Sequence, residues 1–179
     1  MIRTRKPEKT ALQRAFTAIV VIAFIAVMHA CGVYSFTGAS IPAGAKTFSV
    51  DFFPNHAPMV QPTLSQVFTD ALKDKFSRQT NLRLENGLGD LHFEGSITAY
   101  SVQPQAIGAD DRAAQNRLTI TVRVKFVNEF EPENDFEQNF SRYYDYPSNR
   151  SLAEVENEAI DVITEALVED IFNRAVVNW

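Results

Sequence analysis

The sequence predicts an α+β fold, a two-layer sandwich in which two amphipathic helices pack on one face of a four-stranded sheet. Three observations lead to this prediction. Four segments alternate apolar and polar residues, two segments repeat apolar residues every three or four positions, and their order along the chain is strand, helix, three strands, helix. Alternation is typical of half-buried strands, and the longer spacing is typical of helices with one apolar side. Because every element has one apolar side, two layers bury them all.

Residues 1–30 have the form of a secretory signal peptide. A basic leader precedes an apolar stretch from Ala18 to Met28, and a small residue follows. Arg14 and His29 bracket only fourteen residues. These would extend about 21 Å as a helix at about 1.5 Å per residue, less than the roughly 30 Å of a membrane's hydrocarbon core. A membrane-spanning helix is therefore disfavoured.

The only cysteine, Cys31, directly follows Ala30 at the end of this stretch. A small residue followed by cysteine looks like a bacterial lipobox, in which the cysteine is lipidated and becomes the new N-terminus, although Met28 and His29 depart from the usual pattern. An ordinary signal peptide with an incidental cysteine, or an uncleaved anchor, remains an alternative. A triacylated cysteine would be a durable membrane anchor, since a single acyl chain binds only marginally.

The composition fits one acidic domain. Residues 31–46 contain Gly, Ser, Thr and Pro and predict an extended tether, so residues 47–179 form the single folded domain. The leader holds five of the 17 basic and one of the 22 acidic residues, which leaves 12 basic against 21 acidic residues, a net charge of −9. A domain with this charge is a poor candidate for binding nucleic acid.

The first strand is predicted over residues 47–53, with Phe48, Val50 and Phe52 on the apolar face, and Pro54 ends it. A helix begins near Thr63, because Thr63-Leu-Ser-Gln66 has the form of a capping box and an apolar stripe follows it.

Three strands follow this helix. The second strand is predicted over residues 91–103, with Ala99 among its inward residues, and Pro104 ends it. The third, residues 118–126, alternates five apolar residues with threonines and cations, as in an antiparallel sheet covered on one side. The fourth is residues 136–146. The face of the sheet opposite the helices is left for water or a partner.

The last helix is predicted to begin at Ser151 and to run nearly to Trp179. Ser151-Leu-Ala-Glu154 is a second capping box, and early glutamates suit the positive end of the helix dipole.

No residue pattern predicts catalysis, a metal site or a cofactor. His56 falls in a proline-rich loop and His92 on a strand, and neither has a partner at a metal-ligand spacing. No nucleophile elbow occurs. The sequence therefore predicts that the protein is not an enzyme.

Two groups of side chains are candidates for binding. Four cations would lie on the exposed sheet face and could meet phosphates or acidic sugars: Arg117, Arg123, Lys125 and Arg142. Solvated strand residues that deter edge pairing are the alternative. Three tyrosines at the end of the fourth strand could anchor a partner, or could pack on their own strand end: Tyr143, Tyr144 and Tyr146.

Three stretches are distinctive: Cys31-Gly-Val-Tyr-Ser-Phe-Thr-Gly, then Gly95-Ser-Ile-Thr-Ala-Tyr-Ser-Val, and the ending Asp170-Ile-Phe-Asn with Asn178-Trp179. Together they resemble the LptE family of lipopolysaccharide-assembly lipoproteins of Gram-negative bacteria. Each motif is weak alone, and their order carries the resemblance over essentially the whole chain after residue 30.

The resemblance implies an outer-membrane lipoprotein on the periplasmic face that plugs and helps assemble the LptD β-barrel. It also implies contact with lipopolysaccharide and no cofactor. The cationic positions are inferred from strand alternation and are not carried over from the family. A different lipid-anchored module that binds envelope glycans or small ligands is the alternative, and a small hydrolase using His56 or His92 beside carboxylates is a third.

Overall fold

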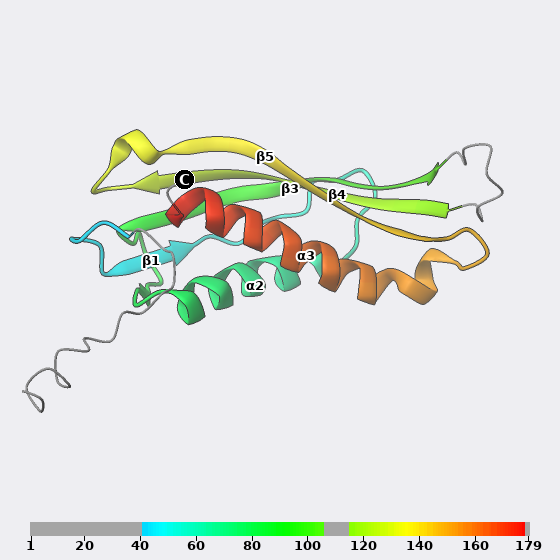
Figure 1. Cartoon of the computed structure of the whole chain (residues 1–179), viewed down its shortest axis with the longest axis horizontal. Helices are drawn as coiled ribbons and strands as arrows, with labels where there is room; N and C mark the ends of the chain where they lie inside the picture. Colours follow the sequence, from blue (N-terminus) through cyan, green and yellow to red (C-terminus); the bar gives the residue numbers. More distant parts are fainter. Residues whose placement is uncertain (1–40, 106–114, 178–179) are drawn as a thin grey trace, which may run out of the picture. The chain divides into compact units, whose positions relative to one another are not determined.

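The structure is a computed structural model that describes residues 41–105 and 115–177. The order of helices and long strands is the predicted one (Figure 1). The elements are β1 (Thr47–Val50), α2 (Leu64–Gln79), β2 (Arg83–Leu84), β3 (Leu91–Gln105), β4 (Gln115–Asn128), the short 3-10 helix η1 (Pro132–Asn134), β5 (Phe136–Pro147) and α3 (Leu152–Val176).

The α+β fold is confirmed, with five strands instead of the predicted four. The sheet order is β2-β1-β3-β4-β5. The additional strand, β2, has only two residues and is therefore too short to show an alternating pattern. β3, β4 and β5 are antiparallel neighbours, whereas β1 runs parallel to both β2 and β3. The parallel pairing arises because α2 returns the chain to the end of the sheet where β1 began.

Alternation in β4 places one set of its side chains under the helices and leaves the other set uncovered. Its even-numbered residues from 118 to 126 are buried, while Arg123 and Lys125 are exposed. Figure 1 shows α3 running alongside the long strands, with α2 next to it. We call the uncovered side of β3, β4 and β5 the open face.

A chain of phenylalanine rings fills the space between the two layers. Phe76 of α2 lies 4.7 Å from Phe93 of β3 and 5.0 Å from Phe172 of α3, measured between ring centroids. Phe93 in turn lies 4.8 Å from Phe126 of β4. Each ring that joins two elements removes apolar surface from water and adds a favourable tilted aromatic contact. The core therefore fixes both helices against the same face of the sheet.

β3 departs from the prediction in two places. A bulge at Thr98 shifts the register between Ile97 and Ala99, so Tyr100 is buried in place of Ala99. The extra residue reverses which side chains face the core. The strand also continues through Pro104 to Gln105, because β4 is its only strand neighbour there among the described residues, and proline is tolerated at an edge.

Two other element ends differ from the sequence prediction. β1 ends at Val50, and Phe53 rather than Phe52 enters the core, since Phe52 is 57% exposed. At α2, Thr63 makes no side-chain cap, and the Oε1 atom of Gln61 accepts the N–H groups of Thr63 and Leu64 at 2.6 and 3.0 Å. A side-chain oxygen two residues earlier thus replaces the predicted capping box.

Candidate functional site

The open face carries three of the four predicted cations in one row along β4. Arg117, Arg123 and Lys125 occupy odd-numbered positions, which point away from the helices. Alternation along a strand places such residues on one face, so the sequence prediction for these three side chains is confirmed. Binding of lipopolysaccharide by them stays a prediction.

Each cation of the row already lies against a carboxylate of a neighbouring strand. The Arg117 guanidinium makes two bonds to Asp145, with Nε at 2.7 Å and Nη2 at 2.8 Å. This pairing holds the pKa of the Asp145 carboxyl below its usual value and raises the pKa of Arg117. Arg117 also stacks over the ring of Tyr143, with 3.6 Å between the guanidinium carbon and the ring centroid. Arg117 is thus held from two sides.

Arg123 and Lys125 are held less firmly. Arg123 lies 2.9 Å from Glu137 of β5, and the Lys125 ammonium lies 2.5 Å from Glu94 of β3. The Lys125 hydrogen bond lowers the pKa of Glu94. Both pairs are largely exposed, and exposed ion pairs contribute only about 0–1 kcal/mol each. An incoming phosphate could therefore displace these carboxylates more readily than it could displace Asp145 from Arg117.

Arg142 lies on the helix side of the sheet, so the prediction that it shares the exposed face with Arg117, Arg123 and Lys125 is wrong. Its register partner in β4 is the buried Ile120, so its side chain points toward the helices. There it makes two bonds of 2.5 Å to Asp170 of α3. The register between β4 and β5 decides this placement, because residues directly opposite in neighbouring strands share a face.

The three tyrosines divide between the two faces. Tyr143 lies on the open face and is 55% exposed, whereas Tyr146 is 2% exposed and belongs to the core. Tyr144 lies on the helix side, where its hydroxyl donates to Glu158 of α3 at 2.9 Å. Packing on the strand's own end therefore fits Tyr144 and Tyr146, and Tyr143 is the tyrosine of this group that a partner at the open face could contact.

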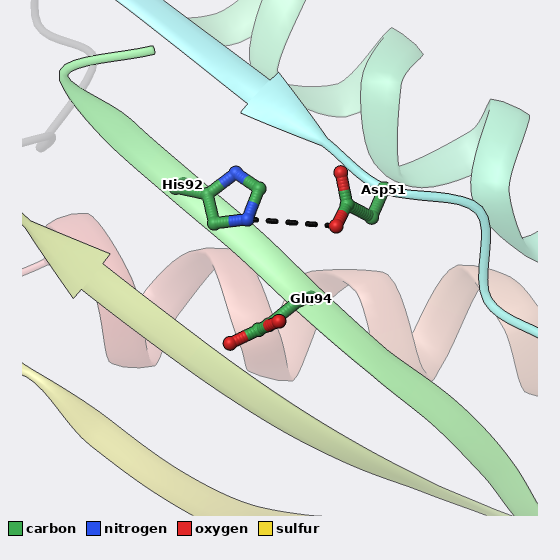
Figure 2. Close-up of side chains that lie close together, drawn as sticks. All are labelled: Asp51, His92 and Glu94. Carbon is green, nitrogen blue, oxygen red and sulfur yellow. Dashed lines mark ion pairs between the residues drawn. The ribbon is translucent and has the colours of Figure 1, made fainter. Parts of the chain in front are cut away.

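The structure brings together three polar side chains, of which the sequence singled out only His92. His92 and Glu94 lie two residues apart on β3, and Asp51 follows directly after β1, as Figure 2 shows. His92 Nε2 lies 3.6 Å from Asp51 Oδ2. His92 Nδ1 lies 2.8 Å from the hydroxyl of Ser49. The parallel pairing of β1 with β3 brings Asp51 to His92, so residue spacing within one segment of the sequence does not reveal the cluster.

The arrangement of Ser49, His92 and Asp51 does not form a hydrolase site. A nucleophilic serine must be reachable by its substrate, yet Ser49 is 3% exposed. Its hydroxyl accepts the N–H of Gly89 at 2.9 Å, so the backbone at Gly89 lies directly against it. The same bond fixes Ser49 as a support for His92.

A hollow of about 450 Å³ lies next to this cluster on the outside of the sheet. Glu94, Arg123, Lys125 and Glu137 contribute charged side chains to its lining, and His56 reaches it from the loop after β1. The hollow thus combines two of the predicted cations with their carboxylate partners. It is a polar surface on which an anionic group could exchange with Glu137 or Glu94.

One predicted site lies outside the residues that the structure describes. Cys31, the predicted lipidation site, lies before residue 41, as does the whole predicted signal peptide. Within residues 41–105 and 115–177, no helix is both long enough and apolar enough to cross a membrane.

Comparison with known proteins decides the family. The LptE model, described as lipopolysaccharide-assembly, matches residues 45–175. The chain belongs to the LptE family. The family's description, lipopolysaccharide assembly, agrees with the resemblance seen in the sequence. No curated protein matches the chain.

Solved structures from other bacteria are similar to this chain. The hypothetical protein CT253 from Chlamydia trachomatis has a TM-score of 0.51 and 7% identity, over 75% of this chain and 99% of that chain. A minor lipoprotein from Acinetobacter baumannii has a TM-score of 0.48 and 12% identity, over 73% of this chain and 91% of that chain. Lipoprotein B from Nitrosomonas europaea has a TM-score of 0.46 and 13% identity, over 79% of this chain and 86% of that chain. At such identities the likeness to CT253 shows a shared fold alone.

Proposed function

We propose that this chain is a lipid-anchored plug and assembly factor for an LptD-type outer-membrane β-barrel, and that it contacts lipopolysaccharide on its way to the outer leaflet. The observation that carries the proposal is the LptE match over residues 45–175, which spans nearly all of the described fold. Within residues 41–105 and 115–177 the helices cover one side of the sheet only, which supports the proposal because the open face is a broad surface for contact.

The membrane anchor is part of the same proposal. Residues 1–30 are removed as a signal peptide, Cys31 is lipidated, and residues 31–46 tether the domain of residues 47–179 to the periplasmic face of the outer membrane. The tether ends where Asp90 accepts the N–H groups of Lys46 and Thr47 at 2.7 and 2.9 Å. These two bonds fix the backbone at the start of β1, where the folded domain of the proposal begins.

Copurification tests the proposal directly. The full chain is solubilised from outer membranes in mild detergent, and its partner is identified by mass. We expect a large β-barrel to copurify, and depletion of the chain should leave that barrel misassembled. Recovery of the chain as a free monomer, together with normal barrel assembly in its absence, would count decisively against the plug.

Crosslinking tests which surface meets the barrel. A photoreactive residue at Tyr143 probes the open face, and one at Val162 of α3, which is 47% exposed, is the matched probe on the helix side. We expect Tyr143 to crosslink to the barrel. A crosslink from Val162 alone would assign barrel contact to the helices and remove Tyr143 from the partner surface.

The alternative function is that of a lipid-anchored module that binds envelope glycans or small ligands. Its signature would be a deep apolar pocket between the sheet and the helices. The phenylalanine rings that link α2, β3, β4 and α3 occupy that space. The geometry thus favours the plug.

A further inference from the structure

Asp51, His92 and Glu94 combine the chemistry of a metal site with its spacing. One ligand atom from each of the three side chains lies within 4.8 Å of the other two. Tetrahedral zinc has bonds of about 2.0–2.2 Å to nitrogen and carboxylate oxygen, so its ligand atoms stand roughly 3.4 Å apart. The 3.6 Å between His92 Nε2 and Asp51 Oδ2 is already close to that value.

The histidine is oriented as a metal ligand requires. Its Nδ1 faces the hydroxyl of Ser49 at 2.8 Å, and Ser49 is itself fixed by the N–H of Gly89. When Nδ1–H donates to Ser49, the lone pair of Nε2 points toward Asp51 (Figure 2). A hydrogen bond at the second ring nitrogen is the usual support of a metal-binding histidine.

The histidine of the cluster is more buried than its carboxylates. The side chain of His92 is 12% exposed, whereas that of Asp51 is 59% exposed. The Glu94 side chain is 39% exposed, so both carboxylates reach the surface and are free to rotate toward a bound ion, while the imidazole is held in place. Three protein ligands leave the fourth tetrahedral position to water.

Lys125 competes with a cation at this place. Its ammonium donates to Glu94 Oε1 at 2.5 Å, which leaves the second oxygen of Glu94 for a ligand bond. The like charges of the ammonium and a bound cation repel each other, so Lys125 lowers the affinity without blocking the position. Two carboxylates against one ammonium still leave the cluster with net negative charge.

We propose that Asp51, His92 and Glu94 bind a zinc ion at the edge of the open face. An imidazole nitrogen favours zinc over magnesium and calcium, which prefer sites made of oxygen alone. The ion joins the end of β1 to β3 and so stabilises the folded chain when it binds. This site is independent of the plug, since it needs neither LptD nor lipopolysaccharide.

Zinc titration tests the assignment. The full chain is purified in detergent without a histidine tag, and zinc is titrated in competition with a chromophoric chelator. Asp51→Asn and Glu94→Gln should each weaken binding at least about tenfold. Glu137→Gln makes the same charge change on the same face but lies outside the cluster, and should leave the affinity unchanged. All variants keep Cys31 and His56, so binding by those residues cannot mimic the difference.

Two further measurements sharpen the test. Lys125→Met removes the competing ammonium and should tighten zinc binding several-fold, a gain that loss of structure cannot produce. Zinc should also raise the melting temperature of the native chain but not that of Asp51→Asn, whose exposed side chain is not needed for folding.

Wild-type affinity in both carboxylate variants, Asp51→Asn and Glu94→Gln, would overturn the site. Equal loss in Glu137→Gln, or equally tight binding of magnesium, would also overturn it.

Discussion

At the residue scale, Gly95 allows β3, β4 and the loop after β1 to meet. An ideal Cβ at this position would lie 2.0 Å from the carbonyl oxygen of Arg123 and 2.7 Å from the ring of Phe53. Phe53 is fully buried and packs edge-on against Phe68 of α2 at 5.0 Å. The missing side chain is therefore what lets Phe53 cover the middle of β3.

Gly95→Ala should lower the free energy of unfolding by about 1–3 kcal/mol, because the added methyl group forces the backbone at Arg123 or the ring of Phe53 to shift. Urea unfolding measures the change. Gly87→Ala is the matched control, since no atom lies within 4 Å of its Cβ position, and it should change stability by less than about 0.5 kcal/mol. Equal stability of the two variants would show that β3 and Phe53 can relax freely.

Asp90 makes the start of β1 sensitive to acid. Its carboxylate accepts the N–H groups of Lys46 and Thr47, and these bonds lower its pKa from the ordinary value of 3.8. In the folded chain Asp90 holds its proton less tightly than in the unfolded chain. Its contribution to stability is therefore complete above pH 3.8 and is lost as the pH falls through the lower, folded pKa.

Asp90→Asn should be less stable than the native chain by about 1 kcal/mol at neutral pH, because the amide oxygen is a weaker acceptor than a carboxylate. The difference should vanish at strongly acidic pH, where Asp90 is protonated in the native chain. Urea unfolding at a series of pH values checks both points. Asp161→Asn, on an exposed turn of α3, is the control and should stay within about 0.5 kcal/mol throughout.

At the element scale, the two helices begin by different devices although their sequences look alike. At α3 the Glu154 carboxylate accepts the N–H of Ser151 at 2.6 Å, which confirms the predicted capping box. At α2 the amide of Gln66 donates to Asp70 instead, and Gln61 caps the helix. Ser151 has an extended backbone conformation, whereas Thr63 is already in the α-helical region. A four-residue motif therefore forms a capping box only where its first residue has the extended conformation of a cap.

Gln61→Ala should destabilise the protein by about 1 kcal/mol, the usual cost of losing a helix cap. Thr63→Ala, at the position where the motif predicts the cap, should cost less than about 0.5 kcal/mol, because the Thr63 side chain caps nothing. Thermal unfolding of the two variants makes the comparison. A larger loss in Thr63→Ala would restore the capping role to that residue.

At the scale of the whole molecule, the fold separates an apolar, helix-covered side from a charged open face. The exposed cations Arg123 and Lys125 lie on that face, and each is paired with one carboxylate. A lipopolysaccharide phosphate carries more negative charge than a carboxylate and offers more acceptor oxygens. We therefore expect an anionic headgroup to replace these carboxylates at Arg123 and Lys125, as the proposed function requires.

The double variant Arg123→Glu, Lys125→Glu should bind lipopolysaccharide at least about tenfold more weakly, since two attractions become repulsions. Its fold should remain intact, as circular dichroism can check, because both side chains are exposed. Lys73→Glu with Arg78→Glu makes the same charge change on α2 and should bind nearly as the native chain does. Unchanged binding by the first variant would remove the phosphate contact and leave the plug untouched.

Sequence alone determined the two helices and the four longer strands of this protein, and the sides of its most regular elements. The alternation from residue 118 to 126 places Arg123 and Lys125 away from the core, and the apolar stripes predict both helices. These features depend on the period of a strand or a helix, which a short stretch of sequence displays by itself. The resemblance to LptE also depends only on the order of short motifs.

Only the tertiary structure decided which elements lie together. The register of β5 turns Arg142 toward α3, and the bulge at Thr98 exchanges Ala99 for Tyr100 in the core. The parallel pairing of β1 with β3 brings Asp51 to His92. Register, bulges and strand order are set by the packing of segments that are distant in the chain, and no local period encodes them.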